Sequence, residues 1–178
     1  MEPRLTIPAW DDLRSPASAI NPAGSAAAAT VDQDDGNLVF TNGQTQTVAV
    51  LFQMPHAWKV GSTISFHIHW SKTTSASGTV KWQAKYRWYN IGAVKGSFSA
   101  FVDLTETVAN ADTADLHALA ETPDWAGTGK TISSMIEVVL QRLSSGGSAD
   151  TYGAAVKLAE VDLHYQLDGF GSYLELTK

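Results

Sequence analysis

The chain has 178 residues, of which 44% are hydrophobic and 17% charged, and its formal net charge is −6. This length suits one domain with a sizeable core, and an acidic balance without any long basic run argues against a nucleic acid as the main partner. The sequence contains no cysteine, which excludes disulfides and thiol chemistry, and no apolar run of the roughly 18 residues that a membrane span requires. Because the N-terminus lacks the apolar segment of a signal peptide, we expect a soluble product that is not exported by a standard route.

Residues 1–30 differ in composition from the rest of the chain. Four prolines are spread through them, and proline neither donates to a β-ladder nor fits inside a helix. The amphipathic patch WDDLR contains Trp10 and Leu13, which would gain nothing from lying in a floppy tail. We therefore predict an extended N-terminal arm over 1–30 that packs on a neighbour or along its own domain, and a single domain over 31–178. A disordered terminus is the alternative.

From Val31 onward, short alternating runs follow one another between turn residues such as DDGN at 34–37 and TNG at 41–43. Alternation with a period of two is typical of strands with one face buried. In the first half of the domain, the side chains predicted to face inward are Leu38 and Phe40; Val48, Val50, Phe52 and Met54; Ile64, Phe66, Ile68 and Trp70; and Val80, Trp82, Ala84, Tyr86 and Trp88.

The second half of the chain continues this pattern, with weaker signals between 109 and 130. Leu116–Ala120 fits either a short strand or a helical turn, and Thr131–Leu143 is predicted as a long strand. Two further inward rows are predicted: Phe98, Ala100, Val102 and Leu104, and in the strand 156–168 Ala159, Val161, Leu163, Tyr165 and Leu167. The count is about eight strands without alternating helices, which predicts an all-β fold: an antiparallel β-sandwich of jelly-roll type.

Four stretches of the sequence resemble a known group of proteins. They are WDDLR at 10–14, QMPHAWKVGSTISFHIHW at 53–70, VKWQAKYRWYN at 80–90 and HYQLDGFGS at 164–172. Together they are similar to small virion proteins of tailed bacteriophages, and the similarity covers most of the chain. It implies a jelly-roll structural protein, a homotrimer on the phage head or in a tail or head fibre, which is made in the host bacterial cytoplasm and assembled into the virion. It implies no catalytic residue.

Three histidines pose the sharpest chemical question. His67 and His69 share the outward face of the strand that begins at Thr63, and His56 precedes the turn that leads into it. Side chains at i and i+2 lie about 6–7 Å apart, which rotamers close around an ion such as Zn²⁺ or Ni²⁺. The spacing HxH is nevertheless common by chance, and no carboxylate or cysteine accompanies it. We favour a subunit contact for His67 and His69, with a metal site of His56, His67 and His69, or simple exposure, as the alternatives.

A carbohydrate-binding module is the alternative function, because jelly rolls often bind sugars on aromatic platforms. Trp70, Trp82 and Trp88 fall in inward rows, so core packing explains them better. Trp58 and Trp125 lie in predicted turns and are expected to be exposed, as a sugar platform or an interface anchor.

Catalysis is the least favoured reading. Glu160, Asp162 and His164 share the outward face of the last strand, but the two carboxylates meet only the spacing of about 5–9 Å that a glycosidase requires. The segment GTGKT at 127–131 lacks the first glycine of a phosphate-binding loop, because Asp124 takes that place. We therefore expect no enzyme and no cofactor.

The leading hypothesis is a virion structural protein that self-associates, as a trimer, and attaches to other capsid or tail proteins through its N-terminal arm. The residues predicted to make these contacts are Trp10, Leu13, Trp58, His67 and His69. The competing hypothesis is a glycan-binding module for a host receptor at a phage tail or fibre tip.

Overall fold

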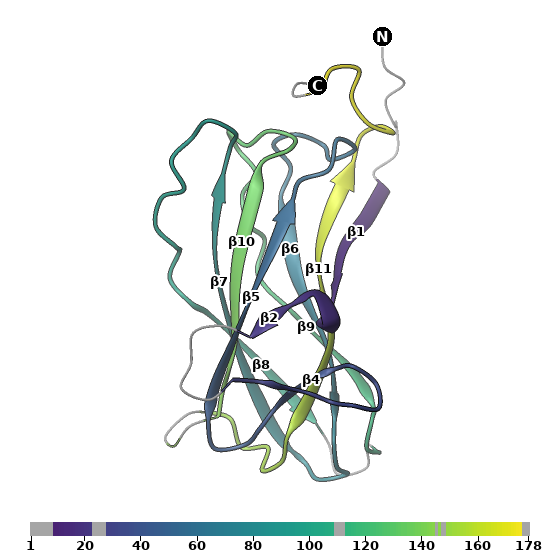
Figure 1. Cartoon of the computed structure of the whole chain (residues 1–178), viewed down its shortest axis with the longest axis vertical. Coiled ribbons are helices and arrows are strands. Elements are labelled where there is room, and N and C mark those ends of the chain that lie inside the picture. The colour runs from purple at the N-terminus through teal and green to yellow at the C-terminus, as the bar shows by residue number, and fades with distance from the viewer. Residues whose placement is uncertain (1–8, 23–27, 109–112, 145, 147–148, 176–178) are drawn as a thin grey trace.

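The computed structural model describes residues 9–22, 28–108, 113–144, 146 and 149–175. Among these residues it contains eleven strands and one short 3-10 turn, η1 (Ala17–Ala19). The strands are β1 (Ala9–Pro16), β2 (Asn21–Pro22), β3 (Thr30–Val31), β4 (Leu38–Phe40), β5 (Thr45–Gln53), β6 (Ile64–Lys72), β7 (Gly78–Tyr89), β8 (Val102–Val108), β9 (His117–Glu121), β10 (Met135–Leu143) and β11 (Val156–Leu167). They form two antiparallel sheets, which confirms the predicted all-β sandwich (Figure 1).

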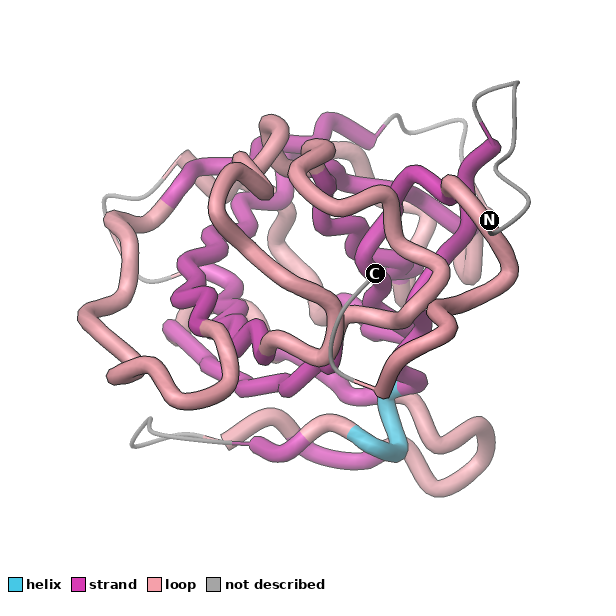
Figure 2. The backbone as a smooth tube through the Cα atoms, turned by 90° about the horizontal axis from the view of Figure 1, so that it is seen from above, coloured by secondary structure: helices cyan, strands magenta, loops and turns pink. Residues whose placement is uncertain are grey.

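The order of the strands is that of a jelly roll. One sheet, which we call the β11 sheet, has the order β3-β4-β11-β6-β9, with β1 also paired to β11. The other, the β10 sheet, has the order β2-β5-β10-β7-β8. Figure 2 looks onto one end of the sandwich, where loops cross between the sheets. Strands β4 to β11 correspond to the eight predicted strands, and the three additional strands come from residues 9–31.

The segment before β4 lies along its own domain and extends both sheets. Strand β1 pairs with β11 over its whole length, from Ala9 opposite Leu167 to Pro16 opposite Glu160, and β2 pairs with β5. Leu13 is half-buried against the core, and Ala17 and Ile20 are buried. The part of the predicted arm over 1–8 and 23–27 lies outside the described residues.

Two tryptophans that were predicted to be exposed are buried, so this expectation is wrong. Trp58 is fully buried, and its Nε1 donates a hydrogen bond of 2.9 Å to Oγ of Ser62. Trp125 pairs through its backbone with Ile64, and its ring stacks on Tyr86 with centroids 4.0 Å apart. Both segments fold back over the open end of the sandwich, where a large apolar ring is removed from water. Their place in turns therefore did not indicate exposure.

The row predicted from Phe98 to Leu104 is only partly right. Strand β8 begins at Val102, and Ala100 and Phe101 before it are exposed. The rings of Phe98 and Phe101 contact cationic side chains on the outer face of β7 instead of packing in the core. The Arg87 guanidinium lies 4.5 Å from the ring centroid of Phe98, and Lys85 Nζ lies 4.5 Å from that of Phe101.

A β-bulge in β11 changes which side chains of that strand point into the core: even-numbered positions before the bulge and odd-numbered positions after it. Leu158 is opposite Trp70, but the next pair joins Glu160 to His69, so Ala159 is the extra residue. Before the bulge Val156 and Leu158 are buried, and after it the buried row is Val161, Leu163 and Tyr165. The prediction that Ala159 belongs to the inward row is wrong, whereas the later part of the row is right.

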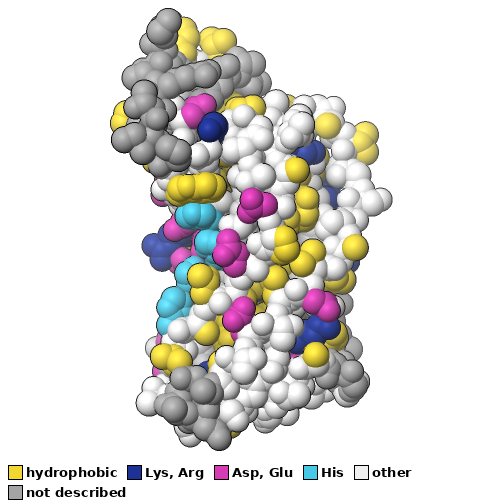
Figure 3. All heavy atoms as spheres, turned by 180° about the vertical axis from the view of Figure 1, so that it is seen from behind, with side chains coloured by type: hydrophobic (Ala, Val, Ile, Leu, Met, Phe, Trp, Pro, Cys, Tyr) yellow, Lys and Arg dark blue, Asp and Glu magenta, His cyan; other side chains and the backbone are white. Residues whose placement is uncertain are grey.

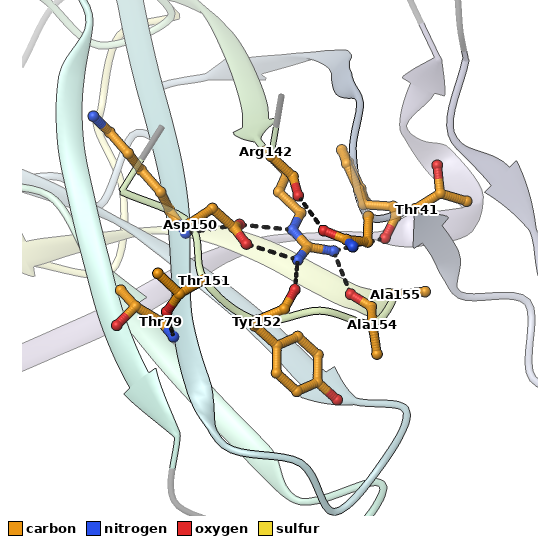
Figure 4. A network of polar contacts seen from close by, with 12 residues as sticks. Thr41, Thr79, Arg142, Asp150, Thr151, Tyr152, Ala154 and Ala155 are labelled. Atoms are coloured by element: carbon orange, nitrogen blue, oxygen red, sulfur yellow. Dashed lines mark hydrogen bonds and ion pairs between the residues drawn. The ribbon is translucent and has the colours of Figure 1, made fainter. Parts of the chain in front are cut away.

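A buried ion pair fastens the two sheets together near one end (Figure 4). Arg142 of β10 and Asp150 both have fully buried side chains and are joined by two hydrogen bonds of 2.9 and 3.0 Å. The guanidinium also donates to three carbonyl oxygens, those of Phe40 in β4 and of Tyr152 and Ala154 before β11. All five guanidinium donors are thus satisfied, which is the condition for keeping an arginine in a core.

The first prediction concerns this pair. Replacing Asp150 by Asn leaves the Arg142 charge buried without its counterion, so the free energy of unfolding should fall by about 3–5 kcal/mol. The matched control is Asp103→Asn, which removes an exposed carboxylate from its pair with Lys81 and should cost less than about 1 kcal/mol. Urea denaturation of both variants measures the difference. Equal losses would contradict the central role of Arg142.

Candidate functional site

Four of the five histidines gather on the outer face of the β11 sheet. They are His67 and His69 on β6, His117 on β9 and His164 on β11. Figure 3 shows histidines interleaved with acidic and basic side chains in a strip along one edge of that view. We call this set, with its neighbours Asp12, Glu121 and Asp162, the histidine cluster.

The centre of the cluster is a row of three side chains on three adjacent strands. His67 lies directly opposite Asp162 of β11 on one side and Glu121 of β9 on the other. Its Nδ1 is 3.2 Å from Oδ1 of Asp162, and its Nε2 is 3.3 Å from Oε1 of Glu121. Each ring nitrogen of His67 therefore faces a carboxylate, one buried and one exposed.

His69 lies one step along the same strand and is held in a similar way. Its Nε2 is 2.8 Å from Oδ2 of Asp162, and its Nδ1 is 2.9 Å from Nε2 of His117. The rings of His69 and His117 are stacked, with centroids 5.1 Å apart. Asp162 is thus approached by two imidazoles, one at each carboxylate oxygen.

Strand β1 completes the surface. Oδ1 of Asp12 is 2.6 Å from Nδ1 of His164, and Arg14 forms two hydrogen bonds of 2.7 and 2.6 Å to Glu160. The ring of Trp10 lies parallel to that of His164, with centroids 4.9 Å apart. Trp10 is 49% exposed, whereas each of the other five tryptophans is at most 6% exposed.

Electrostatics couples the members of the cluster. The interaction with Asp162 raises the pKa of His67 above its usual value, and burial opposes this only in part. Burial would raise the pKa of Asp162, but the two histidines outweigh it and hold that pKa below its usual value. Asp162 lies on the outward face of β11, as predicted, but it is only 1% exposed because His67 and His69 cover it.

An open hollow of about 450 Å³ lies beside the cluster. It is lined by Asp12, Arg14, His69, His117, Ala159, Glu160 and Asp162, whose carbon atoms expose more surface in the hollow than their polar atoms do. A guanidinium, carboxylates and imidazoles around one hollow offer both hydrogen-bond donors and acceptors. Such a lining suits a ligand that combines polar groups with apolar carbon surface.

The structure separates the three histidines that the sequence grouped together. His56 is not part of the cluster: its Nδ1 is 2.6 Å from Oγ of Ser172 and its Nε2 is 2.9 Å from Oγ of Ser133. A metal site that includes His56 with His67 and His69 is therefore not formed. Trp58, predicted to make contacts, has no exposed surface to offer.

Five residues of the cluster were not assigned to a common site from the sequence. His164 and Asp162 were placed together on an outward face, but as a weak acid–base row. Asp12, Glu121 and His117 join them only through strand pairing, which alternation within one strand does not reveal. The same pairing divides the supposed acid–base row, since Arg14 binds Glu160 while the histidines bind Asp162.

A second charged cluster lies on the outer face of the β10 sheet, around Glu137. Its carboxylate accepts hydrogen bonds from Arg87, from the hydroxyl of Tyr89 at 2.7 Å and from Lys95 at 2.6 Å. Burial raises the pKa of Glu137, but these three donors together lower it to about 2. Both carboxylate oxygens are occupied by side chains of this chain, so the cluster stabilises the sheet and its adjoining loop.

Comparisons with known proteins give similarity of fold only. No protein-family model matches the sequence, and no curated protein matches it. Among solved structures, an isomalto-dextranase of Arthrobacter globiformis T6 complexed with panose aligns with a TM-score of 0.54 and 16% identity. The alignment covers 85% of this chain and 23% of that one, so the chain spans about a quarter of the enzyme's length.

Two further solved structures align with lower scores. The module CBM35 from Cellvibrio japonicus Abf62 has a TM-score of 0.47 and 9% identity, with 91% of this chain and 100% of that one covered. The CBM22-1–GH10 modules of a Clostridium thermocellum xylanase complexed with xylohexaose have a TM-score of 0.44 and 9% identity, with 98% and 30% covered. Among the described residues, no helix is long and apolar enough to cross a membrane.

The second prediction concerns Glu137. Because its pKa is lowered on folding, its contribution to stability is present above the ordinary pKa and is lost as the pH falls toward 2. Glu137→Gln should reduce the free energy of unfolding by about 1–2 kcal/mol at pH 7. The gap between wild type and variant should narrow steadily below pH 4.5. Urea denaturation at pH 7 and pH 3 measures it, and a gap of equal size at both values would contradict the assignment.

Proposed function

We propose that this chain is a non-enzymatic carbohydrate-binding module, and that glycans bind on the outer face of the β11 sheet. The observation that carries the proposal is Trp10. It alone among the six tryptophans is substantially exposed, and it is held flat against His164. Asp12, two residues along the same strand, lines the hollow. Pyranose rings stack on large aromatic side chains that are exposed to solvent and held in a fixed orientation.

The chemistry around Trp10 matches the two faces of a sugar. The apolar C–H face of a pyranose would lie on the indole, and its hydroxyls would point toward charged groups. Asp12, Arg14 and Glu160 come from the same two strands as Trp10 and His164, and they line the hollow next to them. Carboxylates that accept and a guanidinium that donates form the paired hydrogen bonds that orient hydroxyl groups.

The fold is compatible with this proposal. The chain is similar in fold to about a quarter of an isomalto-dextranase complexed with panose, and this similarity supports the proposal by its fold alone. In a phage particle, which the sequence resemblance suggests, the ligand would be a glycan of the host surface. The absence of enzymatic activity remains a prediction.

The third prediction tests the platform. The protein should bind a subset of saccharides on an array that includes bacterial surface polysaccharides and α-glucans. Trp10→Ala should weaken binding of the best saccharide by at least about tenfold, because one stacking contact is worth roughly 1.4 kcal/mol or more. Titration can be followed by tryptophan fluorescence, since the other five indoles are buried.

Phe101→Ala is the matched control for Trp10→Ala. Phe101 is an exposed aromatic residue directly before β8 of the opposite sheet, so its loss should leave the dissociation constant unchanged. The proposal fails if no saccharide binds, or if Trp10→Ala binds as tightly as the wild type.

A second candidate function is a virion structural protein, and it can coexist with glycan binding. Exposed apolar side chains lie beyond the end of β11: Phe170 and Tyr173 are each 90% exposed and Leu174 is 58% exposed. This tail lies at the same end of the sandwich as the start of β1 (Figure 1). Large apolar side chains gathered at one end favour contact with another copy or another protein. A homotrimer and attachment to capsid or tail proteins therefore remain proposals.

Attachment through the N-terminal segment cannot be tested by deleting the whole segment. Deleting residues 1–30 would remove β1, β2 and the buried Ala17 and Ile20, so it would test folding as much as attachment.

The fourth prediction concerns self-association. Light scattering of the purified protein should give a mass about three times the 19.1 kDa of one chain, and Phe170→Ser with Tyr173→Ser should lower that mass. A wild-type mass of one chain at micromolar concentration would contradict the trimer. Antibody labelling of phage particles in the electron microscope tests whether the protein is in the virion.

A further inference from the structure

We propose that His67, His69 and Asp162 form a binding site for a divalent transition-metal ion on the outer face of the β11 sheet. The ligand atoms are Nδ1 of His67, Nε2 of His69 and the Asp162 carboxylate, and one potential ligand atom from each residue lies within 4.8 Å of the others. The proposal does not depend on glycan binding.

The first argument is the state of Asp162. Its side chain is 2% exposed, and its Oδ1 receives no hydrogen bond although Nδ1 of His67 is only 3.2 Å away. A buried carboxylate oxygen without a donor is costly, and a cation satisfies it directly. The unpartnered oxygen points at the nitrogen with which it would share an ion.

The second argument is distance. Two ligand atoms on a tetrahedral zinc ion, each about 2.1 Å from it, are about 3.4 Å apart. The separations across the site are 3.2 Å to His67 and 2.8 Å to His69. Each histidine nitrogen is thus slightly nearer to its oxygen of Asp162 than two zinc ligands would be, and one ligand atom from each of the three residues lies within 4.8 Å of the others. An ion bound here would replace the proton now shared between His69 and Asp162.

The third argument is the partner of the second ring nitrogen of each histidine, the one that would not bind the ion. A metal-bound imidazole usually gives its other N–H to a carboxylate, a carbonyl or another acceptor, which fixes the ring and its tautomer. Nε2 of His67 lies 3.3 Å from Glu121, and Nδ1 of His69 lies 2.9 Å from Nε2 of His117. With these partners accepting, Nδ1 of His67 and Nε2 of His69 are both free to bind the ion. Glu121 and His117 are thus positioning residues.

The donor set indicates which ions bind. Two imidazoles and one carboxylate suit Zn²⁺, Co²⁺, Ni²⁺ or Cu²⁺, whereas Ca²⁺ and Mg²⁺ prefer oxygen ligands alone. His69 and Asp162 also line the open hollow, so the remaining coordination positions would be reached by water or by an exogenous ligand.

A competing triad shares His67. Asp12, His67 and His164 also bring ligand atoms within 4.8 Å of one another. In that triad Asp12 is exposed and already in contact with His164 at 2.6 Å, so it has no unmet need for an ion. This difference favours the triad with Asp162.

The fifth prediction tests the site on the full-length protein without a histidine tag. Titration with Zn²⁺ alone at pH 7.5, followed by calorimetry, should show one ion bound per chain. Co²⁺ should give the visible absorption of a low-symmetry site with nitrogen ligands. His69→Ala and Asp162→Asn should each weaken binding by at least about tenfold. Glu121→Gln should weaken it by roughly tenfold while leaving the unfolding midpoint of the metal-free protein unchanged.

Two control variants locate the ion. His56→Ala removes a histidine outside the cluster, and His164→Ala removes the competing triad, so both should bind Zn²⁺ as the wild type does. The proposal is overturned if Zn²⁺ does not bind, or if both His69→Ala and Asp162→Asn bind normally. Loss of binding in His164→Ala together with normal binding in His69→Ala would place the ion at the other triad. His69→Ala keeps the test valid if Asp162→Asn does not fold.

Discussion

The buried pair of Arg142 and Asp150 is the interaction on which the rest of the sandwich depends. Arg142 belongs to β10, the central strand of its sheet, and its guanidinium donates hydrogen bonds to carbonyls of β4 and of the segment that precedes β11 in the other sheet. An arginine is held in a core only when every donor is satisfied, so the geometry admits little displacement. The carbonyls of Tyr152 and Ala154, which Arg142 binds, come directly before β11 and fix the point at which this strand begins. Strand β11 carries Asp162, at the centre of the candidate site.

The bulge at Ala159 then decides which residues of β11 reach the surface. Val156 and Leu158 point into the core before it, and without the extra residue the same alternation would send Asp162 and His164 inward as well. The bulge turns them outward, opposite His67 and next to Asp12. Both the glycan surface and the metal site that we propose therefore rest on one inserted residue in one strand.

The alternation of side chains predicted the buried rows of β6 and β7 because each row is a property of one strand and one core. It did not predict the bulge, although the buried residues of β11 change from even positions (Val156, Leu158) to odd positions (Val161, Leu163) across it. It also did not predict the partners of His67, which are fixed by register between strands. Trp58 and Trp125 were misjudged for a related reason: a loop that folds over the end of a sandwich buries its rings, although its sequence looks like a turn. The site depends on pairing between strands: Asp12 enters it from β1, and His117 and Glu121 enter it from β9.

The same surface is built from two strands that are far apart in the sequence, β1 and β11. Arg14 reaches Glu160 across 146 residues of sequence, and Asp12 meets His164 across 152. Strand β1 is synthesised before β11, with which it pairs in the described part of the sandwich. Strand β1 therefore stays without this partner while the residues between the two strands are made, and the candidate site is completed only after β11 has been added. A chain that stopped before β11 would expose an N-terminal strand with Trp10 on it, and such unpaired strands are what chaperones and proteases recognise.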